Sequence, residues 1–161
     1  MEPVPAGHEP REDMIITENI PLKMHTTFRI GGPARYFANV TTEDELRGAV
    51  LFAREKELPF FVLGGGSNIL ISDAGFPGLV IKMSLRGIAH EKTGDYVRVK
   101  AAAGEPWDDF VKYAVARGWR GVENLSGIPG SVGASPIQNI GSYGSEAKDV
   151  IGSVLVFDAS D

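Results

Sequence analysis

The sequence contains no cysteine in its 161 residues. Disulfide bonds, zinc–thiolate sites, iron–sulfur clusters and thiol catalysis are therefore excluded. No apolar run approaches the ~18 residues of a membrane-spanning helix, and none is long enough for the core of a signal peptide. We therefore expect no membrane insertion and a cytoplasmic location.

Positive charge is also scarce, because 16 Lys and Arg face 21 Asp and Glu for a net charge of −5. A chain of this charge has no broad basic surface, so we expect no nucleic-acid partner. His8, His25 and His90 are scattered and lack metal-ligand spacing, so no metal site is expected. Ser67, Ser131 and Ser135 have no nearby histidine that could serve as a base, which argues against a hydrolase triad.

Apolar and β-branched residues predict a fold of the α+β class. Residues 1–19 are proline-rich at their start and are predicted to be a flexible tail, so that folded structure begins at Ile20. The expected order is a strand at 36–40, a helix starting at Thr41 or Thr42, strands at 60–63, 79–83 and 96–100, a helix at 105–117 and a strand at 151–157. Asp108 and Asp109 are interpreted as the solvated start of the second helix.

A boundary near residues 84–95 divides this pattern into two small subdomains, residues 20–84 and residues 85–161. The strand at 151–157 is followed by turn-forming residues and then by no returning strand. We therefore expect the second subdomain to be incomplete at its C-terminus and the chain to be the front part of a longer protein.

The first of two glycine clusters, residues 64–68 (GGGSN), directly follows the predicted strand 60–63. Successive backbone N–H groups in such a loop form a concave anion site suited to a phosphate or pyrophosphate. The Walker A ending is absent, and Ile69 stands where the dinucleotide fingerprint needs its third glycine. We predict a phosphate loop of another type, with a ligand-free turn as the alternative. On the first interpretation, Val at Gly65 or Gly66 abolishes ligand binding and leaves the protein folded.

The second cluster covers residues 125–144 and mixes glycines and serines with apolar residues. A solvated linker would lack such apolar residues, so we expect this loop to pack while exposing backbone donors. That mixture suits a flat aromatic ligand with polar edges, such as an isoalloxazine ring. A long structural loop without a ligand is the alternative.

Residues 26–34 (TTFRIGGPA), 63–70 (LGGGSNIL) and 127–144 (GIPGSVGASPIQNIGSYG) together resemble the UDP-N-acetylenolpyruvoylglucosamine reductase (MurB) family. These are flavoenzymes of bacterial cell-wall synthesis, and the resemblance runs from about residue 20 to the end of the chain. It implies an FAD-binding fold of the vanillyl-alcohol-oxidase (PCMH) type, in which two α+β subdomains clasp an extended FAD.

The resemblance also implies where the cofactor lies. The first loop would wrap the pyrophosphate, and the second would lie along the flavin and the rest of the cofactor. The implied cofactor-binding residues are Gly64, Gly65, Gly66, Ser67, Asn68, Ile69, Leu70, Pro129, Gly130, Ser131, Val132, Gly133, Ala134, Ser135 and Ile137. Asn139 and Tyr143 are candidates for the edge shared by flavin and substrate. The family's covalently flavinylated relatives attach the ring through a histidine near this loop in the sequence, and no histidine stands there, so the FAD is expected to be non-covalent.

The implied activity is NADPH-dependent reduction of UDP-N-acetylglucosamine enolpyruvate to UDP-N-acetylmuramate in peptidoglycan synthesis. The family's catalytic arginine, serine and glutamate would come after Asp161, so we assign no catalytic residue and expect this chain alone to be inactive. The expected partner is the nucleotide-sugar substrate, and no protein partner is inferred. The alternatives are another FAD-dependent oxidase or dehydrogenase of the same superfamily and a non-catalytic nucleotide-binding module.

Overall fold

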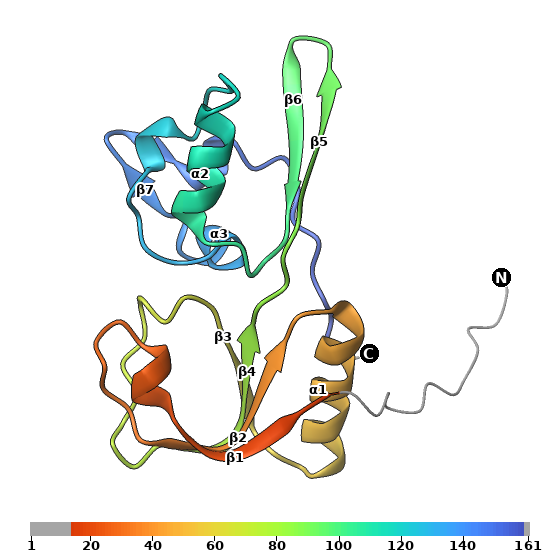
Figure 1. Ribbon diagram of the computed structural model, residues 1–161, viewed down its shortest axis with the longest axis vertical. Coiled ribbons are helices and arrows are strands. Elements are labelled where there is room, and N and C mark those ends of the chain that lie inside the picture. Colours follow the sequence, from red (N-terminus) through yellow and green to blue (C-terminus); the bar gives the residue numbers. More distant parts are fainter. Residues whose placement is uncertain (1–13, 160–161) are drawn as a thin grey trace, which may run out of the picture.

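The computed structural model describes residues 14–159, which form two lobes of mixed helices and strands (Figure 1). We call residues 14–83 the first lobe and residues 84–150 the second lobe. The first lobe contains a four-stranded sheet in the order β1 (Ile16–Pro21), β2 (Pro33–Val40), β4 (Phe76–Met83) and β3 (Phe60–Leu63). β1 runs antiparallel to β2, whereas β2, β4 and β3 are parallel.

Helix α1 (Glu43–Glu55) covers this sheet, and its start is fixed by a capping box. The Thr42 hydroxyl accepts a hydrogen bond from the N–H of Glu45 at 3.1 Å, and the Glu45 carboxylate accepts one from the N–H of Thr42 at 3.1 Å. The helix buries Leu46, Ala49, Val50 and Ala53 against the sheet. The predicted cap and the predicted apolar face are both confirmed.

The second lobe begins with a hairpin of β5 (Ile88–Thr93) and β6 (Tyr96–Ala101), followed by α2 (Trp107–Val115). The remaining elements are short: η2 (Glu123–Leu125), η3 (Val132–Ala134), α3 (Ser135–Gln138), β7 (Gly141–Ser142), β8 (Ser145–Glu146) and η4 (Ala147–Asp149). Trp107 anchors their core, because its indole N–H donates to the Leu125 carbonyl at 2.8 Å within a buried environment. The strand at 96–100 and the helix within 105–117 are confirmed.

Three features differ from the sequence-based expectation. Residues 16–19 are not a tail, because they form most of β1 and pair with β2, which satisfies their backbone hydrogen-bonding groups. Residues 1–13 of the predicted tail lie outside the described residues. β5 was not predicted, because its residues after Ile88 are mostly exposed and polar.

The third difference is the strand predicted at 151–157, which is wrong for the described residues. These residues form no strand and no pairing among residues 14–159, and Leu155 is 81% exposed. They instead follow an extended path back to α1 (Figure 1), where the Arg47 guanidinium lies 5.5 Å from the Phe157 ring centroid. β propensity alone does not make a strand when no neighbouring strand supplies hydrogen bonds. No helix within residues 14–159 combines the length and hydrophobicity that a bilayer crossing needs.

Candidate functional site

The two glycine-rich loops meet where the two lobes join. Residues 64–70 leave β3 at the carboxyl end of the parallel strands, the edge at which open sheets with parallel strands commonly bind ligands. In the register of the sheet, Leu63 pairs with Lys82 of β4, so the start of the loop lies beside the end of that strand. The Lys82 ammonium donates a hydrogen bond to the Gly64 carbonyl oxygen.

The first loop has many hydrogen-bond donors without acceptors. Within residues 14–159, no backbone N–H of residues 64–70 donates to another protein group. The loop is held instead through its carbonyl groups, since Gly66 accepts from the N–H of Thr27 at 2.9 Å. Gly66 has a φ of +70°, the left-handed conformation that turns consecutive N–H groups toward one side. The loop therefore presents backbone donors that the rest of the described chain leaves open.

The glycines of this loop also permit close approach of protein segments. A Cβ at Gly66 would lie 2.0 Å from the His25 carbonyl oxygen, and a Cβ at Gly65 would lie 2.9 Å from the Gly130 Cα. These contacts argue against the sequence-based expectation that Val at either position spares the fold, because protein backbone already occupies that space.

The second loop is built more firmly into its own lobe. Val132 N–H donates to the Glu105 carbonyl at 2.8 Å, and Gly133 N–H donates to the Ala103 carbonyl at 2.9 Å. Ser131 and Ser135 are buried. The Ser67 hydroxyl donates to the Pro129 carbonyl at 3.3 Å, which joins the two loops directly. The structure thus brings the two groups of predicted cofactor-binding residues together at Gly65, Ser67, Pro129 and Gly130.

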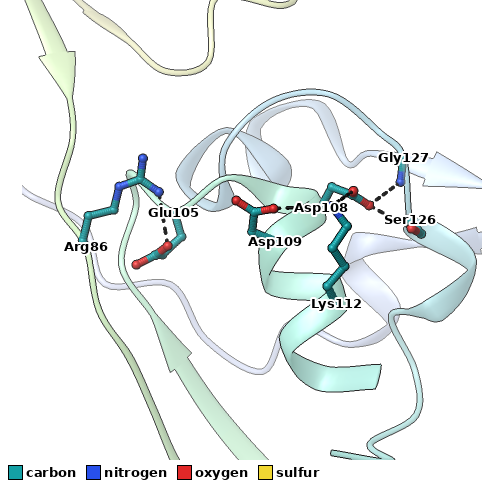
Figure 2. Close-up of polar contacts among 7 residues, drawn as sticks. All are labelled: Arg86, Glu105, Asp108, Asp109, Lys112, Ser126 and Gly127. Atoms are coloured by element: carbon teal, nitrogen blue, oxygen red, sulfur yellow. Dashed lines mark hydrogen bonds and ion pairs between the residues drawn. The ribbon is translucent and has the colours of Figure 1, made fainter. Parts of the chain in front are cut away.

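The beginning of the second loop is held by Asp108 (Figure 2). Its carboxylate accepts from the Ser126 hydroxyl at 2.8 Å and from the Gly127 N–H at 2.7 Å, and it forms an ion pair with Lys112 at 2.8 Å. The Lys112 contact first, then those with Gly127 and Ser126, lower the pKa of Asp108 from 3.8 to about 2. Sequence reasoning assigned Asp108 only to the solvated helix start and missed this anchor, because the spacing of 18 residues to Ser126 carries no local signal.

The end of the second loop contains the two candidates for the flavin and substrate edge. Asn139 has a φ of +42°, and its side-chain amide donates to Glu146 at 2.8 Å while its amide oxygen accepts from the N–H of Lys148 at 3.0 Å. Tyr143 is 89% exposed and Ile137 is 84% exposed. Asn139 therefore shapes the local backbone, whereas Tyr143 and Ile137 present free apolar surface.

A polar cavity of about 430 Å³ adjoins the first loop. His25, Thr27, Arg29, Gly65 and Lys82 contribute to its lining. Sequence reasoning quoted residues 26–34 as a motif and passed over His25 and Lys82. The signal that could have identified Lys82 is a lysine that directly follows three apolar residues, Leu79, Val80 and Ile81, in a predicted buried strand.

Comparisons with known proteins agree with this geometry. Residues 34–161 match the family described as "FAD binding domain". The chain is 45% identical over 145 residues to the UDP-N-acetylenolpyruvoylglucosamine reductase of Cutibacterium acnes, an alignment that covers 89% of this chain and 39% of that protein. It is 47% identical over 138 residues to the enzyme of the same name from Salinispora arenicola, covering 85% of this chain and 38% of that protein.

A solved structure shows the same relationship in three dimensions. The crystal structure of UDP-N-acetylenolpyruvylglucosamine reductase (MurB) from Thermus caldophilus matches with a TM-score of 0.63 at 33% identity, covering 83% of this chain and 45% of that one. The predicted α+β FAD-binding fold is confirmed. The chain spans less than half the length of these relatives.

Proposed function

The chain belongs to the FAD binding domain family, within which it resembles the N-terminal FAD-binding portion of UDP-N-acetylenolpyruvoylglucosamine reductases, and from this premise we propose that it holds FAD non-covalently for such a reductase. The observation that carries the proposal is the run of N–H groups in residues 64–70 that have no acceptor within residues 14–159. Successive backbone donors that the fold leaves open on one side of a loop form a concave site for an anion. A pyrophosphate supplies the acceptors that this loop lacks.

The residues around this loop fit the two chemically different ends of FAD. At the phosphate end, the loop donors lie beside the cations that line the cavity described above. At the other end, the exposed side chains of Ile137 and Tyr143 offer apolar and aromatic contact area on the second lobe. An exposed group of this kind commonly marks a binding surface. We therefore place the pyrophosphate on residues 64–70 and the flavin along residues 129–137.

Within this proposal the chain's residues bind and orient, and they take no part in proton transfer. FAD, when bound, carries hydride from NADPH to the enolpyruvyl group of the nucleotide-sugar substrate. Ser67 links the two loops, and Asp108 and Glu105 fix the second loop, so the cofactor's surroundings are held in place. The groups that protonate the substrate and stabilise its negative charge belong, on this proposal, to residues outside this chain.

The proposal carries two further assignments. One is a division into subdomains between β4 and β5, at residues 84–87, where the chain passes from the first lobe to the second. The other is a cytoplasmic location, the compartment in which NADPH and nucleotide-sugar precursors are available.

Titration of the purified chain with FAD tests the proposal. We expect saturable quenching of flavin fluorescence, and acid precipitation should release the flavin into the supernatant. Flavin that stays in the precipitate would contradict non-covalent attachment. An absence of saturable binding by correctly folded protein would contradict the proposed function itself.

A further inference from the structure

Lys82 occupies an unusual position for a lysine. It lies near the end of β4, an inner strand of the sheet, and directly follows Leu79, Val80 and Ile81, each fully buried. Its side chain is half-buried, and its hydrogen-bond partner is the Gly64 carbonyl. Within residues 14–159 no carboxylate forms an ion pair with it. A cation taken partly out of water without a counter-charge lowers stability.

Arg29 adds positive charge beside this lysine, and His25 adds an imidazole ring whose lowered pKa favours its neutral form. His25 and Arg29 line the same cavity, and no acidic residue is among the described residues that line it. Burial, and after it the positive charge of Arg86, lowers the pKa of Lys82 below its ordinary value. Burial and the charge of Lys82 likewise lower the pKa of His25. Both shifts come first from burial and second from a neighbouring cation, and the described residues that line the cavity include no carboxylate that would oppose them.

The cavity also presents neutral hydrogen-bond donors. Gly65 lines it. The Gly65 N–H and the Gly64 carbonyl belong to the same peptide group, and that carbonyl accepts a hydrogen bond from Lys82. A cation on the carbonyl end of a peptide polarises its N–H end and strengthens it as a donor. An ammonium group has three donors, so Lys82 can hold this peptide and still donate to a second acceptor. Thr27 lines the cavity as well.

Resting on the proposed function, we propose that Lys82, with His25 and Arg29, forms a cationic phosphate subsite that neutralises the pyrophosphate of the flavin nucleotide. The lysine binds one phosphate directly and strengthens the Gly65 N–H as a donor to the same group. Because its side chain is half-buried, its attraction to a phosphate is less screened by water than that of a fully exposed lysine. The unpaired cation of the ligand-free protein thus acquires its counter-charge on binding.

Affinities of Lys82→Gln and Lys82→Arg for inorganic pyrophosphate, FAD and NADPH test this subsite. Lys82→Gln should lose roughly tenfold or more in affinity for pyrophosphate and FAD, because a charge-assisted hydrogen bond is removed. Lys82→Arg should retain most of the affinity. The control is Lys100→Gln, which removes an exposed strand lysine on β6 and should change neither affinity.

The unfolding temperature of the ligand-free protein separates binding from a structural role. If Lys82 only anchored the first loop, Lys82→Gln would lower the unfolding temperature. The proposed subsite predicts an unchanged or higher unfolding temperature together with weaker FAD binding, because the variant removes a half-buried cation that has no ion-pair partner within residues 14–159.

The remaining outcomes distinguish this inference from the proposed function. Equal FAD and pyrophosphate affinities for wild type and Lys82→Gln would overturn the subsite and leave the proposed function standing. Lys82-dependent binding of pyrophosphate without FAD binding would support the subsite and contradict the proposed function. A Lys82 effect on NADPH but not on FAD would overturn the assignment to the flavin nucleotide.

Discussion

Residues 64–70 and residues 126–135 are both rich in glycine and serine and lie against each other, yet their backbone donors are used differently. In the first loop, no N–H has an acceptor within residues 14–159, whereas in the second the N–H groups of Gly127, Val132 and Gly133 are paired with Asp108, Glu105 and Ala103. The first loop is therefore the one whose backbone donors are left open to a ligand or to water. The second provides a fixed surface next to it.

The glycines of the two loops also differ, in how closely other parts of the chain approach them. Gly66 and Gly127 both have positive φ, +70° and +76°. A Cβ at Gly66 would meet the His25 carbonyl, whereas a Cβ at Gly127 would meet no atom within 4 Å. Gly66 is thus required both for its positive φ and for the close approach of the His25 segment. Gly127 is required only for its positive φ. The sequence alone does not tell a glycine needed for close packing from one needed only for its backbone conformation.

The largest effect that tests this difference comes from Gly66→Ala. Left-handed φ costs an L-residue about 1–2 kcal/mol, and the 2.0 Å approach to the His25 carbonyl forces the backbone to move as well. We expect a loss of unfolding free energy of about 3 kcal/mol or more and loss of FAD binding. Urea denaturation and FAD titration measure the two quantities.

Gly127→Ala is the matched control, because it shares the conformational penalty and lacks the steric contact. It should cost only about 1–2 kcal/mol and weaken FAD binding little. Equal losses of stability for the two variants would show that the contact between Gly66 and the His25 segment is unimportant, and the distinction between the loops would fail.

Much of the fold could be predicted because its signals are local. The Thr42 cap, the spacing of Leu46, Ala49, Val50 and Ala53, and the apolar run at Phe60–Leu63 each specify an element without distant partners. β1 and residues 151–157 could not be predicted correctly because strand formation depends on a neighbour. Ile16 pairs with Ala38, 22 positions away, whereas residues 151–157 have no partner strand within residues 14–159.

The site was predictable to a similar extent. The glycine clusters identified both loops from the sequence, and the structure brings them into contact at Ser67 and Pro129. Lys82 and Asp108 were missed, because each acts through a contact between segments 18 or 19 positions apart, Lys82 with Gly64 and Asp108 with Gly127. Side-chain chemistry of this kind becomes visible only when the register of the sheet and the path of the loop are known.

Ser67→Ala is expected to have an intermediate effect, and it tests whether the two loops act together. The variant removes the hydrogen bond from the Ser67 hydroxyl to the Pro129 carbonyl, an exposed contact of 3.3 Å. FAD affinity should fall roughly tenfold, in line with one lost donor, while the unfolding free energy changes by about 1 kcal/mol or less. Fluorescence titration measures the affinity, with Ser153→Ala, an exposed serine outside both loops, as the control. Unchanged affinity would mean that the loops bind independently of this link.

Asp108→Asn is expected to have the smallest effect, and it tests whether the second loop depends on its carboxylate anchor. The contacts with Lys112, Gly127 and Ser126 lower the pKa of Asp108 to about 2, below its ordinary value of 3.8. A lowered carboxyl pKa stabilises the folded state above the unfolded-state pKa, and this contribution disappears as pH falls through the folded-state value. The wild type should therefore be slightly more stable than Asp108→Asn at pH 7, and the difference should shrink as pH falls from about 4 toward 2.

Thermal unfolding between pH 7 and pH 3 measures this difference, and amide hydrogen exchange at Gly127 reports the loop directly. The Gly127 amide should exchange faster in Asp108→Asn, because its acceptor is weakened, while amides of β4 should keep their protection. Asp109→Asn is the control, since Asp109 also pairs with Lys112, at 3.5 Å, but belongs to no contact with residues 126–127 in the described part of the chain. If Gly127 exchanges equally fast in both variants, the carboxylate of Asp108 does not hold the second loop, and the fixed character of that loop must come from its contacts with residues 103–105 alone.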